Sequence, residues 1–163
     1  MLSQSVATSM AEVRCEKDGP VWTITIDNQA KRNAFSGGMV YQLRAFLEEA
    51  NASPKARVAI VTGAGDVAFS SGHDLSEMLG HGDEAYGKEA NLGFLLPHSM
   101  RIPVIAAVNG YAYAAGFILA MSCDLRVASE NARFATPGAK VGLLPIGGQL
   151  SRLFHLLPQA KVL

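Results

Sequence analysis

Residues 102–123 contain no charged side chain over 22 consecutive positions, and this stretch limits what the chain can fold into. By length alone it could cross a lipid bilayer, because a membrane-spanning helix needs about 20 apolar residues. The pair Asn109-Gly110 interrupts it with a strong turn signal, after a β-branched run and before an alanine-rich stretch. We therefore predict a buried strand followed by a buried helix, with a membrane-anchored protein as the alternative.

The overall composition is that of one globular domain. The chain has 163 residues, of which 49% are hydrophobic and 17% are charged, whereas a disordered chain has little apolar surface. Its 14 basic and 14 acidic residues give a net charge of zero, so it has no general attraction for phosphate backbones or anionic lipids. We expect neither nucleic acid nor a membrane as a partner.

Cysteine use and the first residues bear on location. Cys15 and Cys123 lie far apart in a chain that needs no disulfide framework, which favours a reducing compartment. Residues 1–11 show no basic region followed by an apolar region, so no secretory signal is predicted. The expected location is the cytoplasm, or the mitochondrial matrix if the chain is eukaryotic. We expect a flexible tail over 1–10 and one core over 11–163.

Strand patterns favour a parallel sheet. Short apolar runs at 58–61, 104–108 and 125–128 are typical of strands buried on both faces of such a sheet. A β-branched run at 21–26, with 12–17 before a turn at 18–20, predicts a hairpin.

Helices are expected between and after these strands. Ser36 can cap the first, which ends at 51–54 and has four apolar residues on one face: Val40, Leu43, Leu47 and Ala50. Others are expected around 83–96, after Tyr113, and over 150–157 before Pro158. Alternating strands and helices predict an α/β fold with right-handed crossovers.

Two segments of mainly small residues, 69–75 and 109–116, follow predicted strands. Small residues let a ligand approach the main chain. A helix that begins in the second segment would also direct unpaired backbone N–H groups at the ligand. If both donor sites converged, they would form an oxyanion hole that stabilises an enolate or a tetrahedral oxyanion. Spacing alone does not establish that convergence.

Four blocks in order resemble the crotonase, or enoyl-CoA hydratase/isomerase, superfamily: residues 31–34, 69–75, 102–110 and 123–124. The resemblance implies an α/β spiral of ββα units with a mostly parallel sheet, which binds acyl-CoA thioesters. It also implies relatives that continue beyond Leu163 with further helices and assemble as trimers or dimers of trimers. On that basis we expect a truncated core, a homo-oligomer and a role in fatty acid metabolism.

The same resemblance assigns site residues. The thioester oxygen would be held by the backbone N–H groups of His73 and Ala115. Contacts to coenzyme A carry over, mostly through main chain, to Arg32, Ala34, Ser70, Gly72, His73, Asp74 and Leu75. Because coenzyme A is then part of the substrate, no separate cofactor or metal is expected. For the Arg32 side chain, a phosphate contact and a solvated loop position stay equally open.

The acid positions of the family hold residues that cannot transfer a proton. By resemblance, the two hydratase glutamates correspond to Ile118 and Gly138, and an isomerase carboxylate corresponds to Ile146. General acid–base catalysis contributes roughly two to four orders of magnitude in rate. We therefore expect a reaction other than two-glutamate hydration.

Three functions stay open. The first is an acyl-CoA enzyme, a lyase or isomerase, that stabilises an enolate in its oxyanion hole. The second is a non-catalytic acyl-CoA-binding or regulatory protein. The third is a decarboxylase-like enzyme that uses His73, because a decarboxylase branch of the family carries a similar Ser-Gly-His-Asp segment. A packing role is favoured for the His73 ring and for Tyr111 and Tyr113.

Overall fold

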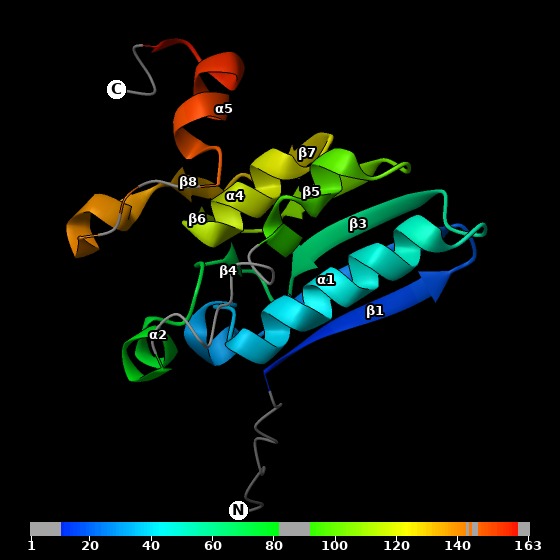
Figure 1. The fold of residues 1–163 in the computed structure, drawn as a ribbon, viewed down its shortest axis with the longest axis horizontal. Helices are drawn as coiled ribbons and strands as arrows, with labels where there is room; N and C mark the ends of the chain where they lie inside the picture. Colours follow the sequence, from blue (N-terminus) through cyan, green and yellow to red (C-terminus); the bar gives the residue numbers. More distant parts are fainter. Residues whose placement is uncertain (1–10, 82–91, 143, 145–146, 160–163) are drawn as a thin grey trace, which may run out of the picture.

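The computed structural model describes residues 11–81, 92–142, 144 and 147–159, and Figure 1 shows their arrangement. The strands are β1 (Glu12–Asp18), β2 (Val21–Asp27), β3 (Val58–Gly63), β4 (Ala68–Ser70), β5 (Val104–Val108), β6 (Tyr111–Tyr113), β7 (Leu125–Ala128) and β8 (Arg133–Ala135). The α-helices are α1 (Gly37–Ala52), α2 (Leu75–His81), α4 (Ala115–Ser122) and α5 (Gln149–Leu156). Short 3-10 helices are η1 (Gln29–Lys31), η3 (Leu92–Phe94), η4 (Leu96–Ser99) and η5 (Pro137–Val141).

The larger sheet has five strands in the order β1-β2-β3-β5-β7. β1 and β2 form the predicted hairpin, in which Asp18 pairs with Val21 across a two-residue turn. All other pairings in this sheet are parallel. The prediction of a mostly parallel α/β sheet is confirmed.

A second, smaller sheet has three short parallel strands in the order β4-β6-β8. Each of β3, β5 and β7 is followed in the chain by one strand of this small sheet and then by a helical segment. The chain therefore repeats a ββα unit. We predicted no strand in these positions, because three-residue strands are too short to show a hydrophobic period.

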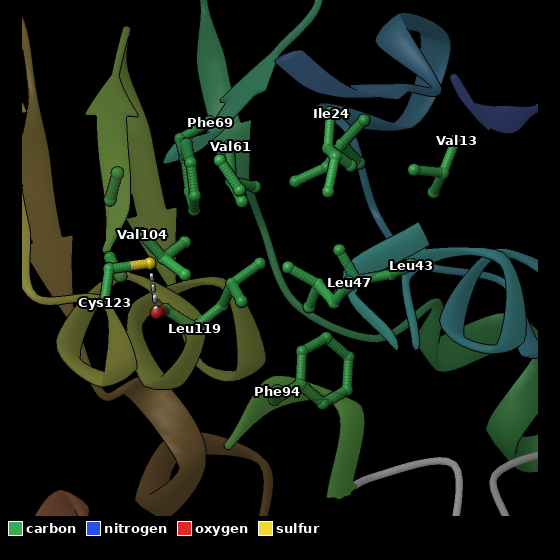
Figure 2. Packing of buried hydrophobic residues seen from close by; sticks show 14 of the residues in the cluster. Val13, Ile24, Leu43, Leu47, Val61, Phe69, Phe94, Val104, Leu119 and Cys123 are labelled. Carbon is green, nitrogen blue, oxygen red and sulfur yellow. Dashed lines mark hydrogen bonds between the residues drawn. The ribbon is translucent and has the colours of Figure 1, made fainter. Parts of the chain in front are cut away.

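Helix α1 covers the hairpin side of the large sheet, as Figure 1 shows. Ser36 is its N-cap, and its Oγ accepts a hydrogen bond from the Met39 N–H at 3.4 Å. All four residues predicted for its apolar face are fully buried. In Figure 2, Leu43 and Leu47 lie in the core between Ile24 of β2 and Phe94. The first predicted helix is confirmed.

The uncharged segment folds as β5, β6 and α4. Asn109 lies between the two strands, where its Nδ2 donates to the carbonyl oxygens of Gly63 and Gly65 at 2.8 and 2.6 Å. These bonds satisfy the polar side chain and tie the end of β5 to the loop after β3. Among the described residues, no helix has the length and apolar character needed to cross a membrane.

The burial predicted for residues 125–128 is wrong. They form strand β7 as expected, but β7 is the edge of the large sheet, and all four residues are exposed. Leu125 and Val127 are 58% and 66% exposed. The sequence Leu-Arg-Val-Ala therefore indicated a strand here, but it did not indicate which strands lie beside it.

The helix predicted over 83–96 is also corrected. Residues 82–91 lie outside the described residues. Instead of an α-helix, 92–94 form the 3-10 helix η3, and Leu95 is the N-cap of the 3-10 helix η4, which begins at Leu96. Gly93 lies against α1, where an added Cβ would be 3.1 Å from the Cβ of Arg44. Pro97 at the start of η4 cannot continue a helical hydrogen-bond ladder.

The helix predicted over 150–157 is confirmed as α5, whereas α2 was not predicted. With seven residues, α2 is too short to give a clear amphipathic period. The predicted tail at 1–10 lies outside the described residues.

Candidate functional site

The two small-residue segments meet at one point in the structure. A Cβ built on Gly72 would lie 2.9 Å from the Cβ of Ala114 and 3.2 Å from the backbone nitrogen of Ala115. Gly72 has a φ of +100°, so it provides both the conformation and the space for this approach. The two segments, whose relation spacing alone left open, are therefore in contact at Gly72.

Phe35 fixes the orientation of the His73 peptide. The Phe35 N–H donates to the Gly72 carbonyl, and the Phe35 carbonyl accepts from the Asp74 N–H, both at 2.8 Å. These two bonds form a parallel bridge between Phe35 and His73. Because successive N–H groups of an extended chain point to opposite sides, the His73 N–H points away from Phe35.

The second donor is at the start of α4. Ala115 is the first helical residue, so its N–H has no acceptor within the helix, and it lies at the positive end of the helix dipole. Ala114 turns the chain from β6 into α4 with φ +48° and ψ −117°, a conformation that is strained for a residue with a side chain. Its N–H donates to the Ala135 carbonyl at 3.0 Å, which anchors the turn to β8.

The side chain of His73 lies in a row of aromatic rings. Its ring centroid is 5.2 Å from that of Phe94, with the planes at 88°. Phe94 in turn makes an edge contact with Phe35, with centroids 5.0 Å apart. Phe94 is only 2% exposed, so the imidazole packs against a core residue. Tyr111 and Tyr113 pack on each other, with centroids 5.2 Å apart.

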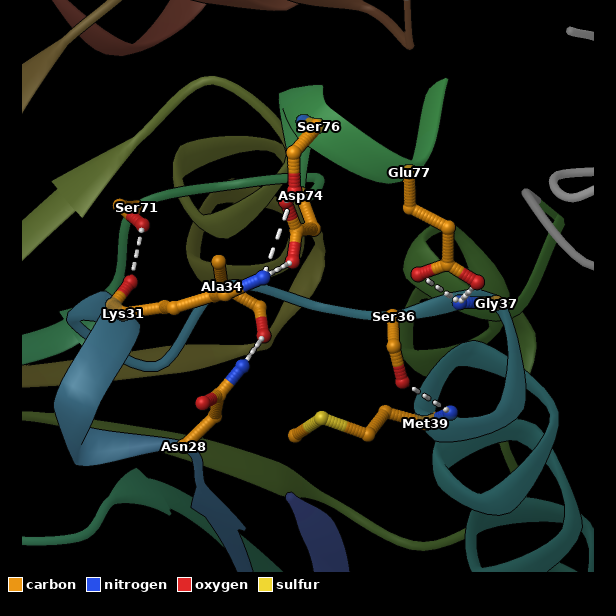
Figure 3. A network of polar contacts seen from close by, with 10 residues as sticks. All are labelled: Asn28, Lys31, Ala34, Ser36, Gly37, Met39, Ser71, Asp74, Ser76 and Glu77. Carbon is orange, nitrogen blue, oxygen red and sulfur yellow. Dashed lines mark hydrogen bonds and ion pairs between the residues drawn. The ribbon is translucent and has the colours of Figure 1, made fainter. Parts of the chain in front are cut away.

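Asp74 is a buried carboxylate that follows His73 directly. Its Oδ2 contacts Lys31 Nζ, and its Oδ1 accepts from the backbone N–H and the Oγ of Ser76 at 3.0 and 2.5 Å (Figure 3). The hydrogen bond from Lys31, followed by that from Ser76, lowers the pKa of Asp74 below its ordinary value of 3.8. As an ionised cap at the start of α2, Asp74 has a structural part in holding this loop.

The carboxylate of Glu77, three residues after Asp74, accepts a hydrogen bond at the start of α1. Both of its carboxylate oxygens lie 3.2 Å from the Gly37 nitrogen and accept its N–H, as Figure 3 shows. A carboxylate at a helix N-terminus is favoured by the helix dipole. The contact therefore ties α2 to α1.

The remaining residues expected to contact coenzyme A surround the same loops. Arg32 is exposed, has φ +54°, and accepts the Ser71 N–H on its carbonyl at 3.0 Å. Ser70 is fully buried, and its Oγ accepts the Gly72 N–H at 3.2 Å. Arg32 and Ser70 thus shape the loop before His73 from two sides.

Ala34 and Leu75 differ in exposure. Ala34 is buried at 5% exposure, and its carbonyl accepts from Asn28 Nδ2 at 2.8 Å. Leu75, at the start of α2, is 48% exposed. The structure therefore brings the expected residues to one region, with the side chains of Ala34 and Ser70 buried and those of Arg32 and Leu75 exposed.

Sequence reasoning missed Asn33, which holds this region together. It is 1% exposed and has φ +55°. Its Nδ2 donates to the carbonyls of Ala64 and Ala68 at 2.9 and 2.6 Å, and its Oδ1 accepts the Asn28 N–H at 2.9 Å. The signal was present, because an asparagine in a tight loop often adopts a positive φ and bonds to backbone.

The three positions without an acid have different surroundings. Ile118 is 7% exposed, and a Cβ built on Gly147 would come within 2.7 Å of its Cδ1, so the two residues are in close contact. Gly138 lies in η5. Ile146 lies outside the described residues.

Gln149 was also missed, although it is a polar residue buried beside the second donor. It is 6% exposed, and its Nε2 donates to the carbonyl of Ala114 at 3.3 Å. The only signal in the sequence was one amide side chain directly after Gly147-Gly148 and before an amphipathic helix.

Among the residues that the structure describes, no group of three or more His, Cys, Asp or Glu side chains could hold a metal ion. The Cys123 thiol is not poised for ligation, because burial raises its pKa to about 12.

Comparisons with known proteins agree with this architecture. A sequence model of the family described as Enoyl-CoA hydratase/isomerase matches residues 16–162. A carnitinyl-CoA dehydratase from Salmonella enteritidis PT4 is 42% identical over 149 residues, which cover 90% of this chain and 56% of the relative. A solved carnitinyl-CoA dehydratase from Mycobacterium avium 104 is 34% identical with a TM-score of 0.83, over 92% of this chain and 59% of that one.

A solved structure described as a probable enoyl-CoA hydratase/isomerase from Mycobacterium abscessus is 37% identical, with a TM-score of 0.82 over 93% of this chain and 59% of that one. The predicted spiral of ββα units is confirmed by these likenesses. The chain spans just over half the length of the curated relatives it matches.

Proposed function

Because the chain belongs to the enoyl-CoA hydratase/isomerase family, we propose that it binds an acyl-CoA thioester and holds the thioester oxygen between the backbone N–H groups of His73 and Ala115. The observation that carries this proposal is the contact of Gly72 with the first turn of α4, which brings the two donors together. Fixed donors of this kind stabilise a developing oxyanion without reorganisation.

Main-chain contacts would hold the coenzyme A portion. The chain has no net charge, so attraction for a polyanion has to be local. Arg32 is exposed and stands at the loop before the first donor, which suits a charge-assisted contact with a phosphate. Lys31 beside it is already paired with Asp74.

The reaction type follows from the relatives and from the residues present. Relatives named carnitinyl-CoA dehydratase make addition or removal of water the reaction to test first. Against efficient hydration stands Ile118, a buried apolar residue where a family glutamate is expected. We therefore propose carbonyl polarisation and enolate stabilisation as the chemistry, without two-glutamate hydration.

A second candidate is an acyl-CoA-binding protein without catalysis. Ile118 favours it, because an isoleucine buried against Gly147 leaves no proton-transfer group at that position. The decarboxylase alternative would need the His73 imidazole to act on the substrate. The edge contact between that ring and Phe94 supports a packing role instead.

The binding proposal is tested by replacing Ala115 with proline. Proline is tolerated at the first position of a helix, and its ring carbon replaces the amide hydrogen, so the Ala115→Pro variant deletes one donor. Circular dichroism checks that the variant still folds, because proline also restricts the backbone of the preceding Ala114. The readout is the infrared carbonyl band of crotonyl-CoA labelled with 13C at the carbonyl. We expect a shift to lower frequency on binding to the wild type and a smaller shift in the variant. No binding, or equal shifts in both proteins, would contradict the proposal.

Turnover assays separate the two candidates. The panel contains crotonyl-CoA for hydration, a 3-hydroxyacyl-CoA for dehydration and malonyl-CoA for decarboxylation. Calorimetric binding with no turnover favours the second candidate. Robust hydration of crotonyl-CoA would refute the inference that Ile118 and Gly138, at the positions of the two family glutamates, prevent efficient hydration.

We also propose self-association. Several large apolar side chains of β7, β8, α5 and the C-cap of α5 are more than 40% exposed: Leu125, Val127, Phe134, Phe154, Leu156 and Leu157. Exposed apolar surface of this kind is typical of interfaces. Light scattering coupled to gel filtration measures the mass of the assembly, and a strictly monomeric mass would overturn this proposal.

A further inference from the structure

Gln149 bonds to the peptide group that carries the second donor. The carbonyl of Ala114 and the N–H of Ala115 belong to one planar peptide unit. Gln149 Nε2 donates to that carbonyl at 3.3 Å, and the Ile118 N–H donates to it at 3.0 Å. Whatever fixes the carbonyl oxygen of this unit therefore also fixes the direction of the Ala115 N–H.

The unit needs such support, because its conformation is strained. Ala114 has φ +48° and ψ −117°, a conformation that is unfavourable for a residue with a Cβ. Strain of this kind persists only where surrounding contacts hold the backbone. Gln149 supplies one of these contacts from α5, an element that follows α4 by 27 residues in the chain, since α4 ends at Ser122 and α5 begins at Gln149.

Burial makes the bond more effective. Gln149 is 6% exposed, so solvent competes little for its amide. A hydrogen bond on a peptide carbonyl also polarises the N–H on the other side of the same unit, which strengthens that N–H as a donor. The close contact of Gly147 with Ile118 seats this segment on the first turn of α4.

We propose that Gln149 is a positioning residue for the oxyanion site: its side-chain amide orients and polarises the Ala114–Ala115 peptide, through which the Ala115 N–H contacts the thioester oxygen. This inference rests on the proposed function. It adds a residue from α5 to a site otherwise built from β4, β6 and the start of α4.

The test compares two variants of nearly the same side-chain length. Gln149→Met removes the amide, and Gln149→Glu replaces the donor with a carboxylate that can only accept while ionised. Each protein is saturated with 13C-carbonyl crotonyl-CoA, and the infrared carbonyl band is recorded. Saturation separates carbonyl polarisation from affinity, which is measured by calorimetry. We expect a smaller low-frequency shift in both variants and binding weaker by about fivefold, the effect of one hydrogen bond.

Ser151→Ala is the matched control, because Ser151 is an exposed residue of the same helix. It should retain the full shift. Full shifts in Gln149→Met and Gln149→Glu would overturn this inference while leaving the proposed function intact. Absence of any shift in the wild type would overturn the proposed function itself. Loss of folding in both variants, seen by circular dichroism, would also contradict the inference, because Gln149 would then be a structural residue.

Discussion

Lys31 and Asp74 are 43 residues apart in the chain, and their ion pair ties the loop after β2 to the start of α2. The ion pair holds the residue next to the first proposed donor, because Asp74 follows His73 directly. Asp74 is nearly buried, whereas the Lys31 side chain is 54% exposed. Solvent therefore screens the pair in part, and we expect a contribution of about 0.5–1 kcal/mol.

The ion pair should make stability depend on acid pH. The pKa of Asp74 is lowered in the folded protein, first by the hydrogen bond from Lys31 and then by that from Ser76. The stabilisation is therefore present above the ordinary carboxyl pKa and is lost as the pH falls through the folded value. We expect Asp74→Asn, which keeps a capping side chain, to lower the free energy of unfolding at pH 7 and to match the wild type at the acid end.

Urea unfolding followed by circular dichroism from pH 7 downward measures this difference. Lys31→Gln should behave like Asp74→Asn. Glu130→Gln, a neutralisation of an exposed carboxylate, serves as the control for general charge effects. A wild-type advantage that grows as the pH falls would contradict the assignment.

Gly72 and Ala114 should be energetically coupled. In Gly72→Ala the new Cβ would lie 2.9 Å from the Cβ of Ala114 at a φ of +100°, so we expect a loss of about 2 kcal/mol or more. Ala114→Gly relieves the strain at φ +48°, and we expect a gain of about 0.5–1 kcal/mol. The double variant should be less damaged than the sum of the two, because the Cβ clash is gone. Additive free energies of unfolding would show that the contact carries no strain.

Local signals explain which parts of the fold were predictable. Local sequence signals predict the β1–β2 hairpin and α1: a turn at Gly19-Pro20 for the hairpin and an N-cap at Ser36 for the helix. The small sheet has no such local signal, because β4, β6 and β8 are only three residues long and show no hydrophobic period. The exposure of β7 depends on its place at the sheet edge, and a strand's own residues do not specify which strands lie beside it.

The candidate site, like the fold, was only partly predictable from local sequence signals. Segments around His73 and Ala115 were identifiable because small residues after strands leave backbone donors accessible. Their contact at Gly72 was not, because it depends on how β4 and β6 pair. Gln149 was missed for a related reason: its role depends on α5 reaching the start of α4, a long-range contact that no local pattern specifies.

Asn33 should tolerate almost no change of its side-chain amide. In Asn33→Asp, a carboxylate would face the carbonyls of Ala64 and Ala68, which now accept from the asparagine Nδ2. Loss of these donors in a buried position, with a buried negative charge, should cost about 3 kcal/mol or more. Thermal and urea unfolding measure this loss. Asn28→Asp, at a less buried asparagine of the same loop, is the comparison and should be milder.

The two cysteines should differ in reactivity. Burial raises the pKa of the Cys123 thiol to about 12, and its Sγ lies 3.3 Å from the Leu119 carbonyl within the core shown in Figure 2. At pH 8 only about one thiol in ten thousand would be ionised, and the thiolate is the reactive form. Cys15 on β1 is only half-buried, and burial raises its pKa from 9.0, so it should react slowly but measurably.

Iodoacetamide labelling followed by peptide mass spectrometry tests this difference. In the folded protein we expect modification of Cys15 alone, and in urea modification of both. Cys15→Ser should abolish native labelling, which excludes slow reaction at Cys123 as its source. Modification of Cys123 at the rate of Cys15 under native conditions would mean that the end of α4 opens to solvent. Because α4 begins at Ala115, such opening would also loosen the helix that carries the second proposed donor.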